Sequence, residues 1–247
     1  MSRYYCDLHI HSCLSPCGDD DMTPANIAGM ASINGLQIVA LTDHNSSKNC
    51  PAFFKAAKKN GLIPIPGMEL TTAEDIHLVC LFRSLDDAME FDRFVEERMI
   101  PFPNNPEIFG HQHIIDDEDN VAGEIENLLL NATTLTIEEA FVEVVKRGGV
   151  CYPAHIDRQS NGIIAVLGTF PDEPRFTAYE LNDASADEEY RERCPITKTL
   201  SRAVSSDAHY LWNIAEADFS IELDDEPYSS DKVRNSLIDY LLGKTST

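Results

Sequence analysis

Long apolar runs, secretion signals and paired cysteines are all missing from this chain of 247 residues. No apolar run approaches the roughly 20 residues that a membrane-spanning helix needs. The segment 1–7 has neither the basic nor the apolar region of a secretion signal. The seven cysteines are scattered and include no C-x-x-C pair, which is typical of free thiols in a reducing compartment. We therefore expect a cytoplasmic protein that contacts no membrane.

Basic residues are also scarce, with 19 Lys and Arg against 42 Asp and Glu, so the formal net charge is -23. The acidic excess is spread along the chain and forms no tail. Non-specific affinity for nucleic acid comes largely from Lys and Arg that neutralise phosphates. We therefore expect the protein not to bind long duplex nucleic acid. The sequence contains no signal for a particular oligomeric state.

Short apolar segments alternate with helix-like segments, which is the pattern of βα units around a parallel sheet or barrel. With 43% hydrophobic residues, no internal repeat and no convincing linker, residues 1–247 are expected to form one α/β domain. The expected strands are 4–10, 37–42, 62–70, 76–82, 149–154, 178–182, 202–206 and 218–224. The expected helices are 24–34, 51–61, 84–99, 136–149 and 229–243.

Local signals add detail to this outline. Thr23 has the position of a helix N-cap, and Thr136 and Glu139 have the spacing of a capping box. The two prolines within 62–70 indicate an edge strand or an interrupted one. Residues 100–132 show neither the apolar period of a helix nor that of a strand, so we expect an irregular, flap-like insertion there.

Acidic and histidine side chains fall where the expected strands end. They are His9 and His11, Asp43 and His44, Glu69, His155, and Asp207 and His209. His9 and His11 stand two residues apart on an extended segment, so their imidazoles project to the same side. In a βα barrel the loops after the strands converge on one catalytic face. Five such strand ends, in a chain with eight histidines, predict a multinuclear metal site on that face.

The same stretches carry a resemblance to a known family. In chain order, DLHIHS, LTDHN, GME with IHLV, PAH and SSDAH resemble the successive motifs of the PHP (polymerase and histidinol phosphatase) family of metal-dependent phosphoesterases. The resemblance runs from Asp7 to His209. It implies a distorted (β/α)7-type barrel with a metal site at the C-terminal ends of the strands.

The resemblance also implies three divalent metal ions, which would be zinc, manganese or iron. The ligands that it implies are His9, His11, Glu69 and Asp207 for the first ion, Glu69, His77 and His155 for the second, and His44 and His209 for the third. We assign Glu69, Asp207 and His209 to catalysis as well. His111 and His113 match no motif of the family, and we interpret them as flap or surface residues.

The third ion needs one more ligand from the loop after His11. Many family members have an aspartate before a glycine there, whereas this chain has Cys17 before Gly18, followed by Asp19. A cysteine thiolate favours a softer ion such as zinc or iron, and an aspartate suits manganese or magnesium. We predict that Cys17 is the ligand, with Asp19 as the alternative. A packing role for Cys17 is the third possibility.

His77 raises a question of strand direction, because it precedes its apolar segment where the other candidates follow theirs. A strand of six residues spans roughly 20 Å, so a ligand at its start lies on the wrong face if that strand is parallel to the others. The strand is antiparallel, or it is displaced, or His77 is not a ligand. Because the family motif has a histidine here, we predict a ligand on an irregular strand.

The chemistry of such a site is hydrolysis of a phosphate ester. Clustered histidines and carboxylates let metal ions hold phosphate oxygens and lower the pKa of a water, which then attacks phosphorus as hydroxide. We expect a small phosphorylated substrate, namely a nucleotide, a sugar phosphate or a short oligonucleotide end. Arg158 is the candidate phosphate clamp, with an ordinary surface salt bridge as its other possible role, and Lys48 is a weaker candidate.

Two other functions are compatible with parts of this pattern. An amidohydrolase also uses H-x-H after its first barrel strand, although no metal-bridging lysine is evident at a strand end here. A non-catalytic, regulatory metal-binding domain would be expected to have lost ligands. Asp7 beside His9 and Asp43 beside His44 either orient imidazoles from behind or serve as capping residues.

Overall fold

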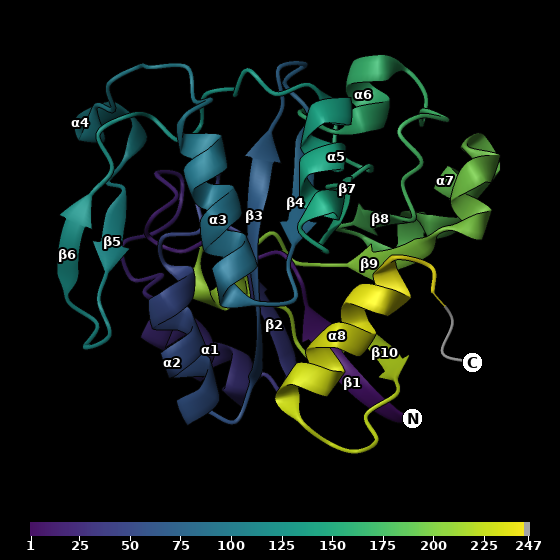
Figure 1. The fold of residues 1–247 in the computed structure, drawn as a ribbon, viewed down its shortest axis with the longest axis horizontal. Coiled ribbons are helices and arrows are strands. Elements are labelled where there is room, and N and C mark those ends of the chain that lie inside the picture. Colours follow the sequence, from purple (N-terminus) through teal and green to yellow (C-terminus); the bar gives the residue numbers. More distant parts are fainter. Residues whose placement is uncertain (245–247) are drawn as a thin grey trace.

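The computed structural model describes residues 1–244 and has an α/β architecture, with helices packed around a curled sheet (Figure 1). The main sheet contains six strands in the order β10 (Ser220–Leu223), β1 (Ser2–Asp7), β2 (Ile38–Leu41), β3 (Ile63–Thr71), β4 (His77–Leu81) and β7 (Val150–Pro153). A second sheet pairs β8 (Ala178–Leu181) with β9 (Ser201–Val204) in parallel.

The expected α/β barrel class is confirmed, in a strongly distorted form. Among the strands of residues 1–244, only the β1–β2, β2–β3 and β8–β9 pairs are parallel. Strand β4 is antiparallel to both β3 and β7, and β10 is antiparallel to β1. The sheet therefore keeps the C-terminal ends of β1, β2 and β3 at one edge, while β4 contributes its N-terminal end to that edge.

The five predicted helices begin and end close to where the sequence places them, as α1 (Pro24–Ile33), α2 (Cys50–Lys59), α3 (Leu85–Glu96), α5 (Ile137–Lys146) and α8 (Ser230–Leu241). The short helices α6 (Ile163–Leu167) and α7 (Asp187–Arg193) were not predicted. The Thr23 hydroxyl caps α1 by accepting from the Asn26 amide, and Thr136 and Glu139 form the expected capping box of α5. No helix among residues 1–244 is both long enough and apolar enough to cross a bilayer.

Strand β3 corrects one expectation, because it runs without interruption through the middle of the sheet. Residues 63–66 pair with β2, whereas residues 67–71 pair with β4. Pro64 and Pro66 thus lie in the half of β3 that precedes the β4 pairing, where a missing amide hydrogen does not interrupt that ladder. The proline half of β3 thus pairs on one side only, as an edge segment does, whereas the expectation of an interrupted strand was wrong.

The segment 100–132, called the flap below, is more regular than the sequence predicts. It contains the short helix α4 (Pro106–Phe109) and a hairpin of β5 (His113–Ile115) and β6 (Val121–Glu124). The Asn49 side chain holds the hairpin to the body, since it donates to His113 O at 3.0 Å and accepts from Ile115 N at 2.8 Å. Figure 1 shows this hairpin at one side of the molecule, beyond α2 and α3.

Candidate metal centre

The histidine and carboxylate side chains assigned as ligands from the sequence converge on one site. His9 and His11 follow β1, His44 follows β2, Glu69 lies near the end of β3, His77 begins β4, His155 follows β7, and Asp207 and His209 follow β9. All are buried except His77 and His209, which are partly exposed. The ends of six strands thus supply one compact set of ligand atoms.

Five histidine ring nitrogens surround one carboxylate, that of Glu69. Its Oε1 lies 2.8 Å from His77 Nδ1, 3.0 Å from His155 Nε2 and 3.3 Å from His9 Nε2. Its Oε2 lies 3.0 Å from His44 Nδ1 and 3.2 Å from His11 Nε2. Burial raises the pKa of Glu69, but the nearby histidines outweigh burial and hold this pKa well below its usual value. Glu69 is therefore an anion at the centre of the site.

Asp207 completes the first group of ligand atoms with His9, His11 and Glu69. Its Oδ1 lies 3.0 Å from His11 Nε2 and 3.4 Å from His9 Nε2, and those two nitrogens are 3.1 Å apart. Burial raises the pKa of the Asp207 carboxyl, but the two histidines outweigh burial and lower this pKa below its usual value. The group has the same members as the first ligand set that the family resemblance implies.

Two further groups share members with the first. One contains His11, His44 and His209, and the other contains His44, Glu69 and His77. Burial, followed by the charge of His11, lowers the pKa of His44 to about 3 and that of His209 to about 4. Both imidazoles are therefore neutral at pH 7, which is the form that ligates a metal ion. His155 reaches the site through its 3.0 Å contact with Glu69.

His77 reaches the site because β4 is antiparallel to β3. The register pairs His77 with Thr71 and Val79 with Glu69, so the start of β4 lies beside the end of β3. Antiparallel direction was one of the three possibilities left by the sequence. The irregular strand that we predicted is not observed, since all of His77–Leu81 pairs with β3 in register.

Two of the ligand candidates have unusual backbone conformations. His155 has φ 27° and Asp207 has φ 52°, in the left-handed region that residues with a Cβ rarely adopt. Such conformations cost about 1–3 kcal/mol each and persist where the surroundings impose them. Both residues lie among the converging side chains, where His155 contacts Glu69 and Asp207 contacts His11.

Several buried ligand atoms have no hydrogen-bond partner among the described residues. They include His44 Nδ1, Glu69 Oε2 and Asp207 Oδ1. His44 Nδ1 and Glu69 Oε2 lie only 3.0 Å apart, yet their orientation does not form a hydrogen bond. Unpartnered buried polar atoms are costly. Imidazole nitrogens and carboxylate oxygens that converge in this way fit a site for divalent metal ions.

Glu180 is a residue of this site that the sequence reasoning missed. It lies on β8, fully buried, and its Oε1 is 2.8 Å from His9 Nδ1 and 3.2 Å from the His155 amide nitrogen. A carboxylate on the far nitrogen of a ligating imidazole fixes the ring's orientation and tautomer. The available signal was a single glutamate inside the apolar stretch AYEL.

Asp43 and Asp7 organise loops and do not contact the imidazoles beside them. Asp43 accepts from Ser12 N at 2.6 Å and from Ser15 Oγ at 2.8 Å, and Ser15 Oγ lies 3.0 Å from His11 Nδ1. Asp43 thus supports His11 through a serine. Asp7 accepts from the backbone amides of Ser206 and Ala215 and so ties β1 to the loop after β9.

Cys17 and Asp19 belong to none of the groups of converging ligand atoms found within residues 1–244. Burial, followed by the charges of Glu69 and Asp207, raises the pKa of the Cys17 thiol far above its usual value. The thiol thus experiences the negative charge of the site. Asp19 is partly exposed, and its backbone amide donates to His209 O at 2.9 Å.

Arg158 and Lys48 have different surroundings. Arg158 lines the metal pocket together with Ser160 and Asn161, and its guanidinium lies 2.6 Å from Asp207 Oδ2. Lys48 does not line that pocket, and its ammonium pairs with Glu96 Oε1 at 2.7 Å. The structure thus brings Arg158 to the site but not Lys48.

Comparison with known proteins identifies the family. The sequence matches the PHP domain over residues 7–149, which is more than half of the chain. The chain belongs to the PHP family. Over 90 residues this PHP protein is 36% identical to DNA polymerase III PolC-type from Thermotoga petrophila, a match that covers 36% of the chain but only 6% of the polymerase.

Solved structures show the same fold at low sequence identity. Endonuclease Q from Pyrococcus furiosus matches 99% of this PHP protein with a TM-score of 0.66 and 18% identity, and the match spans 57% of the endonuclease. A putative metal-dependent phosphoesterase from Bifidobacterium adolescentis matches 83% of the chain and 87% of its own length, at 16% identity and TM-score 0.56. An amidohydrolase from Chromobacterium violaceum matches 89% and 92%, at 18% identity and TM-score 0.52.

One of these comparisons corrects the expectation about nucleic acid. Endonuclease Q has also been solved with a 27-mer duplex that has an abasic lesion at its active site, and that structure matches 99% of this chain and 58% of its own, at 18% identity and TM-score 0.64. The expectation that this chain cannot bind long duplex nucleic acid was therefore wrong.

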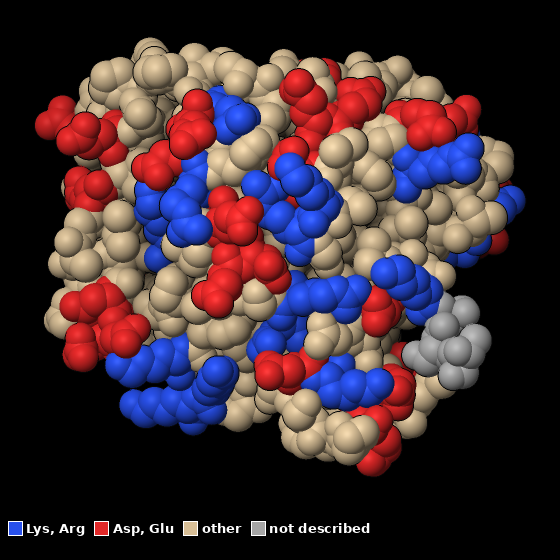
Figure 2. Space-filling view, viewed as in Figure 1, with Lys and Arg blue, Asp and Glu red and all other residues tan. Residues whose placement is uncertain are grey.

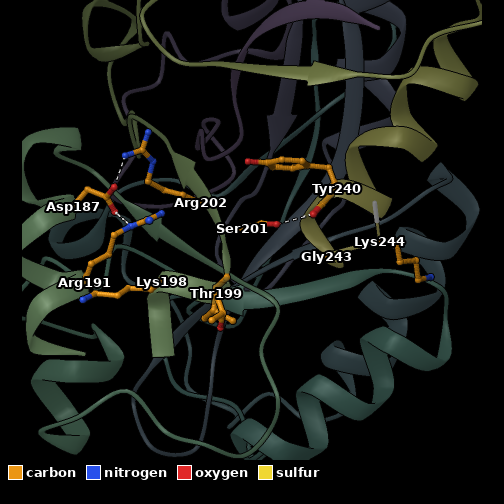
Figure 3. Close-up of a pocket in the computed structure, with 10 residues that line it drawn as sticks. Asp187, Arg191, Lys198, Thr199, Ser201, Arg202, Tyr240, Gly243 and Lys244 are labelled. Atoms are coloured by element: carbon orange, nitrogen blue, oxygen red, sulfur yellow. Dashed lines mark hydrogen bonds and ion pairs between the residues drawn. The ribbon is translucent and has the colours of Figure 1, made fainter. Parts of the chain in front are cut away.

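The error came from using net charge as if it described every part of the surface. Basic and acidic side chains are mixed over the face shown in Figure 2. One open pocket between α7, β9 and α8 is lined by Arg191, Lys198, Arg202 and Lys244, with Asp187 pairing the two arginines (Figure 3). A substrate meets the local charge of its site, and a total of -23 does not determine that charge.

Proposed function

We propose that this PHP protein is a metal-dependent phosphoesterase that hydrolyses a nucleotide, a sugar phosphate or an oligonucleotide end. The observation that carries the proposal is the buried Glu69 carboxylate, which has five histidine nitrogens within 3.3 Å. Unpartnered donor atoms on His44 and Asp207 support it. Divalent ions held there would neutralise phosphate charge and lower the pKa of a water.

We assign the ions to the overlapping groups of ligand atoms. His9, His11, Glu69 and Asp207 would hold one, Glu69 with His77 and His155 a second, and His44 with His209 a third. Cys17 remains our proposed loop ligand for the third ion on the strength of its place before Gly18 in the family motif, and a cation bound there would lower the thiol pKa that burial and the charges of Glu69 and Asp207 raise. Glu180 would keep the His9 Nδ1 protonated, so that Nε2 is free to ligate.

Arg158 is the proposed phosphate clamp. Its side chain is 45% exposed at the pocket, and its contact with Asp207 uses one guanidinium nitrogen. When Asp207 binds a cation, its negative charge is shared with that cation, and the guanidinium is free to turn to phosphate oxygens. A guanidinium offers two parallel donors to a phosphate, which fixes the direction of the ester.

An exposed aromatic pair near the site supports a substrate with a nucleobase. Trp212 is the only tryptophan in the chain, is 76% exposed, and stacks on Tyr210 with ring centroids 4.8 Å apart. Leu211 between them packs against a core cluster, which leaves both rings outside. Trp212 follows His209 by three residues, so their Cα atoms are at most about 11 Å apart. A base of the substrate would stack on this platform.

Nucleotide binding at this platform can be tested by fluorescence, because Trp212 is the single tryptophan of the chain. We expect a mononucleotide to quench Trp212 emission and glycerol phosphate not to quench it. Trp212→Leu should raise KM for nucleotides about tenfold, because roughly 1–3 kcal/mol of stacking is lost. With glycerol phosphate as substrate, both kcat and KM should stay unchanged. Ile33→Leu, at another exposed apolar position, is the control. Equal quenching by both compounds would reject the platform.

The reaction class itself is tested with a substrate panel. We expect purified protein to contain divalent metal, and to hydrolyse phosphomonoesters or short phosphodiesters but not amides or lactones. Chelation should abolish the activity, and Zn, Mn or Fe salts should restore it. Turnover of amides or lactones alone would instead favour an amidohydrolase. Metal without turnover on either panel would favour a regulatory domain.

A further inference from the structure

The flap carries another group of ligand atoms, formed by His111, His113 and Glu124. Glu124 Oε1 lies 3.0 Å from His111 Nδ1 and 3.1 Å from His113 Nδ1. The two imidazole rings are nearly parallel, with 9° between their planes and 4.7 Å between their centroids. Two histidines and one carboxylate therefore direct ligand atoms to one point on the surface.

The hairpin explains why these residues meet. His111 and His113 stand two positions apart on the extended chain that enters β5, so their side chains project to the same side. The β5–β6 register pairs His113 directly with Glu124. The third residue thus reaches the histidines from across the hairpin.

We propose that this group is a separate metal site, which takes a divalent transition ion such as zinc. Two imidazoles and a carboxylate are a common ligand set for zinc, with the remaining positions open to water. In a tetrahedral site with bonds of about 2.1 Å, ligand atoms lie about 3.4 Å apart, close to the 3.0 and 3.1 Å found here.

An alternative is that both imidazoles simply donate hydrogen bonds to Glu124. His111 Nδ1 has the geometry of such a bond. His113 Nδ1 does not: it is buried and without a hydrogen-bond partner, although it lies 3.1 Å from the carboxylate oxygen. A nitrogen that faces a carboxylate at this distance without hydrogen-bond geometry is better suited to share a cation with it.

The site is distinct from the metal centre, since the two share no ligand. Its surroundings also favour a cation, because Asp20 Oδ1 lies 4.0 Å from His113 Nε2 and acidic residues 116–119 form the turn of the same hairpin. The side chains of His111 and Glu124 are each 46% exposed. An ion here would therefore exchange with solvent more readily than one at the buried centre.

An ion at this site would also steady the loop that holds His11. The hairpin contacts Asn49, whose Nδ2 lies 3.0 Å from His113 O and 2.9 Å from Ser12 Oγ. Ser12 in turn donates to Asp43, which supports His11 through Ser15. Binding at the flap would therefore hold one end of a continuous hydrogen-bond chain that ends at a ligand of the metal centre.

The test measures metal content in tag-free, full-length protein dialysed against buffered free zinc. We expect the double variant His111→Gln, His113→Gln to lose one zinc per chain and to keep the rest. Glu124→Gln should weaken the same site at least tenfold, and the neighbouring exposed Glu126→Gln should change nothing. Equal zinc content in the double variant and the parent would overturn the proposal.

The same substitutions in a Glu69→Gln variant test the flap site independently of the function proposed for the buried centre. In a Glu69→Gln chain, which should lose the central ions, we expect one zinc to remain, and the double histidine substitution to remove it. Thermal unfolding in chelator should be the same with and without that double substitution, which excludes misfolding as the cause. Absence of any histidine-dependent zinc in the Glu69→Gln chain would reject the flap site, whatever the outcome for phosphoesterase activity.

Discussion

Glu69→Gln is expected to remove bound metal and nearly all turnover while the protein stays folded. The substitution keeps the shape of the side chain but removes the negative charge of the carboxylate whose Oε1 faces His9, His77 and His155. Its amide would also direct hydrogens at ring nitrogens that should ligate. Because Glu69 is proposed to bridge two ions, one change weakens both.

The loss of metal affinity and activity in Glu69→Gln is best compared with the loss caused by changing Glu180, a carboxylate that contacts a candidate ligand but is not one itself. Glu180→Gln acts only through His9 and the His155 amide, so it should cost about 10–100-fold in metal affinity or activity. Glu69→Gln should cost more than that upper limit. Metal content by elemental analysis and kcat, with the exposed Glu107→Gln as control, measure both. If Glu69→Gln keeps its metals and most of its rate, the bridging role is wrong.

The convergence of the candidate ligands could be predicted from the sequence because two independent regularities coincide at these residues. Parallel strands bring their C-terminal ends to one edge, so side chains distant in sequence, such as His9, His44 and Glu69, become neighbours there. The hydrophobic pattern locates those ends to within a few residues. Ordered family motifs at the same positions then separate ligands from ordinary polar residues.

Residues whose roles depend on strand direction or on side-chain reach could not be found in this way. The direction of β4 is not encoded in the apolar stretch 78–82, so the place of His77 stayed open until its pairing with β3 was known. Lys48 follows β2 in sequence, as a phosphate ligand would, but its flexible side chain turns to Glu96. Glu180 lies within a strand and escaped a search limited to strand ends.

The flap was described poorly from sequence because its order comes from contacts with the body. Strands of three and four residues are too short to show a period of two clearly. The hairpin is held by Asn49, which lies more than 60 residues earlier in the chain. Its regular structure is therefore a tertiary effect, and local propensity alone predicts a loop.

Gly110→Ala is expected to have the second large effect, because Gly110 joins the flap to the loop after His11. Its φ of 98° and ψ of 170° lie in a region that is essentially restricted to glycine. A Cβ there would lie 2.1 Å from Pro16 O, a backbone atom that cannot move alone. Alanine therefore adds backbone strain of about 1–3 kcal/mol and forces the flap away from residues 13–16.

The displacement should reach the metal centre through the loop of residues 12–17. His113 N donates to Cys13 O at 2.9 Å, and Ser15 in the same loop contacts His11. A shift of about 1 Å in a reacting group can cost roughly 100-fold in rate. We therefore expect Gly110→Ala to reduce kcat by about that factor and to expose the flap to limited proteolysis.

The matched control is Gly123→Ala in the same flap. Gly123 has no positive φ, and a Cβ there would meet only Ile114 Cδ1, at 4.0 Å. This variant should stay within about 0.5 kcal/mol of the parent in unfolding free energy and keep its activity. Urea unfolding, proteolysis and kcat of the two variants form the comparison. If both variants behave like the parent, the flap is an independent surface element, and the contacts from Gly110 through Pro16 to His11 do not affect catalysis.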